Sequence, residues 1–181
     1  MLPYDPGSKL VSEPKEVVMD KIKKILAPTD LSELSQAGVR YALNLARAVG
    51  AEVTVYHVID TYELMHHDPL HALDHMLERS EAELGQFLKD HFSDLLPLLE
   101  VRKKVELGAP DANIVEAAKK DGVDLIVIST HGRTGLSHLL MGSVTEKVIR
   151  HAPCPVLSIR PVAREKKIGR ASCRERVYVL V

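Results

Sequence analysis

Short apolar runs alternate with amphipathic stretches along most of the chain, in the repeating order strand, helix, strand. The runs that predict buried strands lie at about residues 21–28, 51–59, 100–107, 125–129 and 156–160. The helical spacing of apolar positions predicts helices at about residues 35–49, 73–96, 110–120 and 143–151. A glycine or a proline follows each of these helices, as expected where a helix ends.

This alternation predicts an α/β fold: a single-domain, Rossmann-like open sheet of five parallel strands with helices on both faces. Ligands bind such sheets beyond the carboxyl ends of the strands, where the strand order reverses. Pro28–Asp30, Val58–Asp60 and Ser129–Gly132 each follow or end a predicted strand. We therefore expect these three separated segments to converge on one crevice.

The stretch Asp124–Val148 carries the clearest functional signal, because it reads as a buried strand, a glycine-bearing loop and a helix. Gly132, Gly135 and Gly142 allow sharp bends and a close approach of the backbone to a ligand. Ser143–Glu146 has the pattern of a capping box, which predicts a helix that begins at Ser143. A helix start offers unpaired N–H groups and a partial positive charge, which suit a phosphate. The stretch therefore predicts an anion or nucleotide site.

Composition narrows the class of protein. The chain has 181 residues, enough for one domain with a sizeable core, and a formal net charge of −1. That charge does not favour a nucleic-acid partner, and no apolar run is long enough to span a membrane. The two cysteines, Cys154 and Cys173, are too few for a disulfide framework. We expect a cytoplasmic protein with neither a membrane nor a nucleic-acid partner.

The two ends differ from the middle. Residues 1–20 are polar and contain three prolines, which predicts a flexible arm before the domain at residues 21–161. Residues 162–181 are expected to form a disordered tail. Within this tail, Ile168–Val177 resembles a translated sequencing adapter, so we interpret it as foreign to the fold.

Five segments match a known family in their order and spacing. They are Ile25–Asp30, Val55–Asp60, Gly108–Pro110, Gly142–Glu146 and Cys154–Arg160. Together they resemble the universal stress protein family over about residues 21–161.

The resemblance extends to the phosphate motif of the family's ATP-binding branch. That motif is a glycine, two residues, a second glycine, nine residues, and then a glycine followed by a small hydroxyl residue. Gly132, Gly142 and Ser143 fit it, whereas Ser129 stands where the first glycine would be. Serine is small, so a close approach of the backbone remains compatible with this departure.

The resemblance implies that the chain binds ATP, with or without Mg²⁺. It places Asp30 near the ribose and the phosphates, and it makes Val58 contact adenine through its backbone. Amides of the glycine loop and of the last helix would hold the phosphates. The implied nucleotide-binding residues are Pro28, Thr29, Asp30, Val58, Ile128, Ser129, Gly132, Arg133, Gly142, Ser143 and Val144. No catalytic residue and no metal-binding site is predicted.

The resemblance further implies a homodimer through the edge strand Val156–Arg160 and a role as a nucleotide-responsive regulator in the stress response. Two alternatives stay open. One is a slow ATPase in which Asp30 or Ser143 helps to place a metal ion, although no clear general base or arginine finger is visible in the sequence. The other is a dimeric interaction module that binds no nucleotide, for which Ser129 is the argument.

Overall fold

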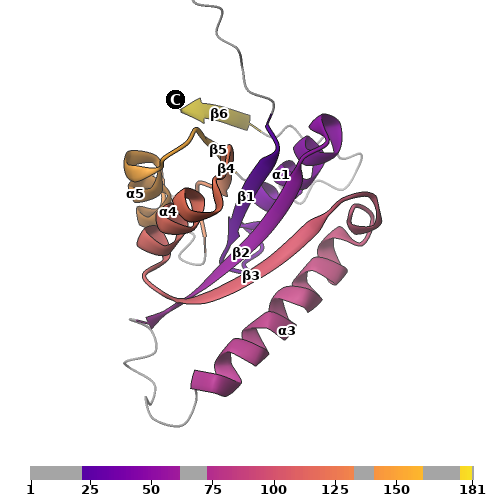
Figure 1. The fold of residues 1–181 in the computed structure, drawn as a ribbon, viewed down its shortest axis with the longest axis vertical. Helices are drawn as coiled ribbons and strands as arrows, with labels where there is room; N and C mark the ends of the chain where they lie inside the picture. The colour runs from indigo at the N-terminus through magenta and orange to yellow at the C-terminus, as the bar shows by residue number, and fades with distance from the viewer. Residues whose placement is uncertain (1–21, 62–72, 133–140, 161–175, 181) are drawn as a thin grey trace, which may run out of the picture.

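The computed structural model describes residues 22–61, 73–132, 141–160 and 176–180, and it folds them around one sheet (Figure 1). The strand order across the sheet is β3-β2-β1-β4-β5-β6. The strands are β1 (Lys24–Thr29), β2 (Glu52–Asp60), β3 (Val101–Gly108), β4 (Leu125–Ser129), β5 (Val156–Arg160) and β6 (Arg176–Leu180). The helices are α1 (Gln36–Val49), α3 (Leu73–Phe92), the short 3₁₀ helix η1 (Leu96–Leu98), α4 (Pro110–Asp121) and α5 (Ser143–His151).

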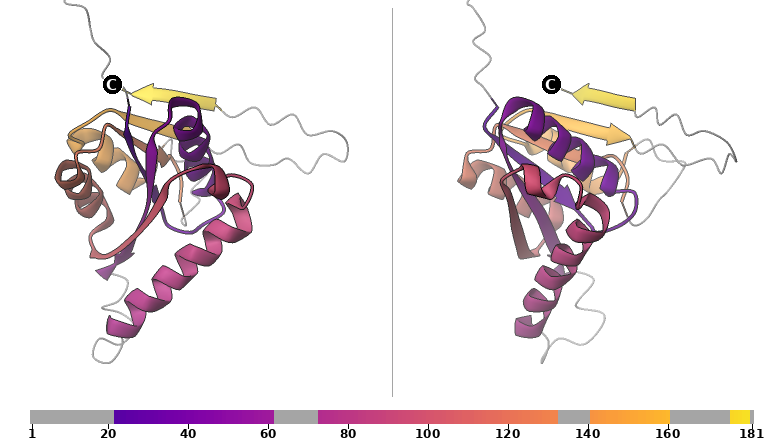
Figure 2. Two further views of the ribbon diagram at one scale, coloured as in Figure 1. Left: turned by 45° about the vertical axis from the view of Figure 1, so that its right-hand side comes forward. Right: turned by 90° about the vertical axis from the view of Figure 1, so that its right-hand side faces the viewer.

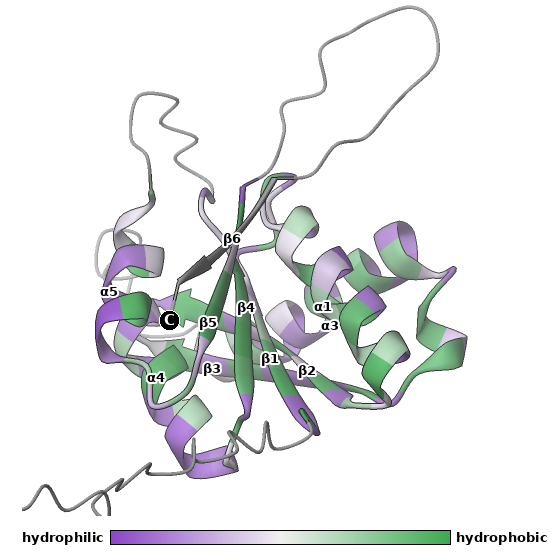
Figure 3. Cartoon of the chain, turned by 90° about the horizontal axis from the view of Figure 1, so that it is seen from above, coloured by the Kyte–Doolittle hydropathy of each residue, from purple (hydrophilic) through white to green (hydrophobic). Residues whose placement is uncertain are grey.

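Strands β1 to β5 are parallel to one another, and helices cover both faces of the sheet, which confirms the predicted fold class. Alternate residues of β1 show how the two faces are used. Ile25 and Ala27 belong to a core that α1 and α3 cover, whereas Leu26 belongs to a second core under α4 and α5. Figure 3 shows the two helix layers on opposite sides of the strands, and Figure 2 shows α3 running beside the β3 edge.

Two helices end at the glycines that the sequence places after them. Gly50 and Gly122 adopt the left-handed conformation after α1 and α4, with φ of 71° and 61°. That conformation costs glycine little and other residues more, so these two helix ends confirm the prediction. Among the described residues, no helix has both the length and the apolar content needed to cross a membrane.

The predicted helix at residues 73–96 is too long, because α3 ends at Phe92. After it the chain tightens into short turns, in which Leu95 N–H bonds to Phe92 O at 2.9 Å and Leu98 N–H bonds to Leu95 O at 3.0 Å. Pro97 lies inside η1 and lacks an N–H group, so it cannot continue the α-helical ladder. The helical period of the leucines nevertheless continues past Phe92, which accounts for the error.

The strand β6 was not predicted. It pairs antiparallel with β5, from Val156 opposite Leu180 to Arg160 opposite Arg176. Two expectations are corrected here: β5 is not the edge of this sheet, and residues 176–180 are a strand within the tail that was expected to be disordered. Arg176–Leu180 alternates valine with other residues, a strand-forming pattern, and the open backbone groups of β5 accept such a segment. The rest of the tail and the expected arm at residues 1–20 lie outside the described residues.

Candidate functional site

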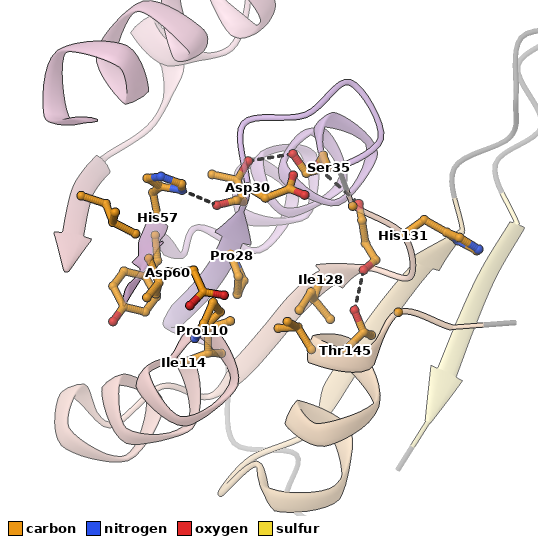
Figure 4. Close-up of a pocket in the computed structure, with 18 of the residues that line it drawn as sticks. Pro28, Asp30, Ser35, His57, Asp60, Pro110, Ile114, Ile128, His131 and Thr145 are labelled. Carbon is orange, nitrogen blue, oxygen red and sulfur yellow. Dashed lines mark hydrogen bonds between the residues drawn. The ribbon is translucent and has the colours of Figure 1, made fainter. Parts of the chain in front are cut away.

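A cavity of about 370 Å³ opens at the carboxyl ends of β1, β2 and β4 (Figure 4). The three segments that were expected to converge do so, because Asp30, Asp60 and Gly132 all line it. All the predicted site residues that the structure describes line the cavity as well. These are Pro28, Thr29, Asp30, Val58, Ile128, Ser129, Gly132, Gly142, Ser143 and Val144. Arg133 lies outside the described residues.

Sequence reasoning missed several other lining residues. They are Ser35, Tyr56, His57, Ser80, Glu83, Pro110, Ile114 and Thr145. Some carried a signal, since Thr145 follows the glycine-serine pair and Pro110 belongs to a segment of the family resemblance. Ser80 and Glu83 carried no such signal. They lie in the middle of α3, and the local sequence does not show which part of a long helix lies beside the carboxyl ends of the strands.

Asp30 stands at the end of β1 on a constrained turn. Its Oδ1 accepts hydrogen bonds from Ser32 N–H at 3.1 Å and from Ser32 Oγ at 2.6 Å. Leu31, between them, has a φ of 63°, an unfavourable value for a branched side chain. Strain of this kind persists where the surroundings fix the chain, and it is often found at binding sites.

Gly132 packs directly against that carboxylate. A β-carbon on Gly132 would overlap Oδ2 of Asp30, and its backbone φ lies outside the left-handed region. The glycine is therefore needed for close approach rather than for an unusual backbone angle. This contact joins the β1 loop to the loop after β4.

The start of α5 forms the opposite wall. The helix begins at Ser143, as predicted, but its N-cap is Gly142 and no side chain caps it, so the capping box expected at Ser143–Glu146 does not form. Gly142 N–H donates to Thr130 O at 2.7 Å. The Glu146 side chain accepts a hydrogen bond from Arg150 instead, with 2.8 Å between Glu146 Oε1 and Arg150 Nη2. The first amides of a helix have no partner inside it, so those of Ser143 and Val144 are suited to bind an anion.

The far end of the cavity uses the backbone of β2. Glu52 N–H bonds to Lys23 O next to β1, whereas Val53 N–H bonds to Glu100 O next to β3. Bonding alternates along a strand between its two neighbours, so Val58 also presents its backbone to the β1 side. The last β1–β2 pair is Thr29 with His57, and β2 continues beyond it. The Val58 carbonyl therefore points to space that β1 no longer fills.

An apolar and a polar wall flank that end. Ile114 and Ile128 belong to the core under α4 and α5, Val144 packs against that core, and all three line the cavity. The buried Tyr56 donates its hydroxyl to Glu106 Oε2 at 2.5 Å. Burial, and then the neighbouring Glu106 carboxylate, raise the pKa of Tyr56, so the phenol stays protonated to a higher pH than a free tyrosine.

No group of three metal-ligating side chains gathers anywhere in the described part of the chain. His67, His71 and His75 are spaced four residues apart, a spacing that on one helix face could hold a metal ion. His75 lies in α3, while His67 and His71 are outside the described residues. Burial raises the pKa of the half-buried Cys154, which makes its thiol less reactive at neutral pH.

Comparison with known proteins agrees with the architecture. The model of the universal stress protein family matches residues 21–160. The universal stress protein MJ0531 of Methanocaldococcus jannaschii is 36% identical over 152 residues, covering 79% of this chain and 85% of that protein. MJ0577, from the same organism, is 33% identical over 153 residues, covering 76% of this chain and 94% of that protein.

Solved structures give the same result. The structure of MJ0577 matches with a TM-score of 0.65 at 32% identity, covering 79% of this chain and 99% of that one. UspA from Lactobacillus plantarum matches with a TM-score of 0.64 at 26% identity, covering 77% and 99%. Family match, relatives and fold agree over the same residues, and so the chain belongs to the universal stress protein family.

Proposed function

We propose that this universal stress protein binds ATP and acts as a cytoplasmic, nucleotide-responsive regulator in the stress response. The observation that carries the proposal is the facing pair of walls in one cavity: the start of α5 with Gly142, and the Asp30 carboxylate packed on Gly132. A volume of about 370 Å³ lies within the range of small-ligand pockets.

The phosphates fit the α5 wall. Gly142 carries no side chain, so its backbone can approach a phosphate closely, and a β-carbon there would crowd Thr130 O at 3.2 Å. The partial positive charge at the start of α5 and the amides of Ser143 and Val144 favour a polyanion. A Mg²⁺ ion would be held mainly by the phosphates, with Asp30 as the nearest predicted carboxylate, because no cluster of protein ligands exists among the described residues.

The nucleoside fits the other end. The Val58 carbonyl is an acceptor for the exocyclic amine of adenine, and the apolar Ile128 and Val144 suit a flat base. Guanine carries a carbonyl oxygen at the corresponding position, so the same acceptor would repel it. The strand geometry therefore supports adenine over guanine.

A thermal-shift series with a charge control tests the proposal. ATP should raise the Tm of the wild type, because a ligand that binds only the native state stabilises it. Gly142→Asp should abolish the shift. Gly142→Asn is the matched control, since asparagine and aspartate are equally good N-caps and nearly equal in size, and it should keep part of the shift. Equal shifts in wild type and Gly142→Asp would refute the phosphate assignment. Phosphate release well above that of Gly142→Asp would favour the slow ATPase.

We also propose a homodimer in which β5 pairs with its copy, as the family resemblance implies. In this chain β6 already lies on that edge in the antiparallel direction. The dimer therefore requires β6 to leave, which makes the tail a competitor for the same backbone groups.

A further inference from the structure

A line of buried hydrogen bonds runs behind the cavity and joins the ends of three strands. It starts at α5, where Thr145 Oγ1 donates to Ser129 O at 2.8 Å. It continues from the Ser129 hydroxyl to Ser35, and from the Ser35 hydroxyl to Thr29 Oγ1 at 2.8 Å. It ends where Thr29 O lies 2.9 Å from His57 Nδ1. Figure 4 marks these bonds around Ser35, Thr145 and His57.

All five residues of this hydroxyl chain (Thr145, Ser129, Ser35, Thr29 and His57) are less than 8% exposed. They come from α5, β4, the start of α1, β1 and β2, and each of them lines the cavity. Buried polar groups that are fully paired hold their elements in one arrangement, because any shift leaves a donor or acceptor without a partner. The hydroxyl chain therefore fixes the α5 wall relative to the Asp30 turn.

Ser129 is the central member, and it serves α1 as a cap. Ser35 is the N-cap of α1 by position, but its side chain makes no cap hydrogen bond. Instead Gly38 N–H, in the first turn of α1, donates to Ser129 Oγ at 3.0 Å, and Ser129 Oγ donates to Ser35 O at 3.3 Å. A hydroxyl 91 residues away along the sequence thus satisfies a helix amide that a local cap normally takes.

Gly38 makes this contact possible. A β-carbon on Gly38 would lie 2.8 Å from Ser129 N and 2.9 Å from Ser129 Oγ. The first turn of α1 therefore rests on the backbone of β4 at the point where the phosphate loop begins. A glycine at position 129 would keep that backbone contact but would leave Gly38 N–H without its partner.

We propose that Ser129 is a positioning residue for phosphate binding, which couples α1 to the α5 wall through the two bonds on its hydroxyl and the one on its carbonyl. This inference rests on the proposed ATP binding and deepens it. The departure from the glycine motif is then a substitution with its own role, because the serine hydroxyl points to α1 and its carbonyl to α5.

The test compares phosphate and nucleoside recognition in matched variants. Ser129→Ala removes the hydroxyl, and Ser158→Ala is the control: Ser158 is fully buried in the neighbouring strand β5 and does not line the cavity. Calorimetry with ATP and with adenosine separates the two ends of the site. Ser129→Ala should weaken ATP binding about fivefold, the equivalent of one net hydrogen bond, and adenosine binding less than twofold. Ser158→Ala should change neither Kd by more than twofold.

If Ser129→Ala does not fold, Thr145→Val tests the same proposal. It removes the hydroxyl that donates to Ser129 O, with little change in side-chain shape. It should shift the ratio of ATP to adenosine affinity in the same direction. An unchanged ratio in either folded variant overturns the positioning role while leaving ATP binding intact. A wild type that binds no ATP overturns the proposed function itself, and this inference with it.

Discussion

Replacing Gly132 by alanine should destabilise the protein only while Asp30 is present. The new β-carbon would overlap Asp30 Oδ2, and the carboxylate cannot move away without disturbing its two hydrogen bonds from Ser32. The φ of Gly132 is one that alanine adopts freely, since it lies outside the left-handed region. The whole penalty therefore comes from one side chain.

The magnitude follows from two opposing effects. Overpacking of a filled site typically costs about 1–3 kcal/mol of unfolding free energy. Replacing glycine by alanine at a compatible φ contributes about 0.4–1 kcal/mol of stability, because the unfolded chain loses freedom. Gly132→Ala should thus destabilise the wild type by about 1–2 kcal/mol, whereas it should stabilise an Asp30→Ala background by about 0.5 kcal/mol.

A double-mutant cycle by urea unfolding measures this reversal. The expected coupling of about 2 kcal/mol exceeds the roughly 0.3–0.5 kcal/mol within which distant mutations add. Gly85→Ala in α3 is the control, because its β-carbon would meet only the flexible Lys103 Nζ at 3.4 Å. That change should have the same effect in both backgrounds. A Gly132→Ala penalty that persists without Asp30 would refute the close contact.

Three further predictions follow from other parts of the fold. Removing the residues after Pro161 should raise the fraction of dimer seen by light scattering at equal protein concentration, because β6 no longer competes for β5, and a truncated chain that stays monomeric would contradict the β5 interface. Gly38→Ala should destabilise by about 2 kcal/mol despite the better helix propensity of alanine, because its β-carbon would lie 2.8 Å from the backbone nitrogen of Ser129; a more stable variant in urea would contradict this packing. The raised pKa of Tyr56 adds stability that is fully present below about pH 10, the unfolded pKa, and is lost as pH rises further, so Tyr56→Phe should lose less stability than wild type above pH 10. Equal alkaline slopes for the two proteins would contradict the buried phenol.

The fold and most of the cavity lining could be predicted because their signals are local. Leu125–Ile128 is apolar throughout and reads directly as part of a strand buried on both faces. Gly50 and Gly122 mark helix ends through their own backbone angles. Parallel strands also place their carboxyl ends at one edge, so Asp30, Asp60 and Gly132 could be brought together without knowing a single distance.

The remaining features depend on contacts between distant segments. Ser80 and Glu83 reach the cavity only because α3 passes its rim, and the pairing of β6 depends on which strand ends up at the edge. The role of Ser129 is the clearest case. A motif comparison shows only a missing glycine, whereas the structure shows a hydroxyl bonded to Gly38 on a different element.

Calorimetric titration of the full chain with ATP and Mg²⁺ tests the central claim most directly. The facing walls of Asp30 with Gly132 and of Gly142 with α5 predict a saturable isotherm with one site per chain, which the single substitution Gly142→Asp removes. The absence of binding heat at millimolar ATP over a range of temperatures, or an isotherm that Gly142→Asp leaves unchanged, would contradict a phosphate site at the start of α5.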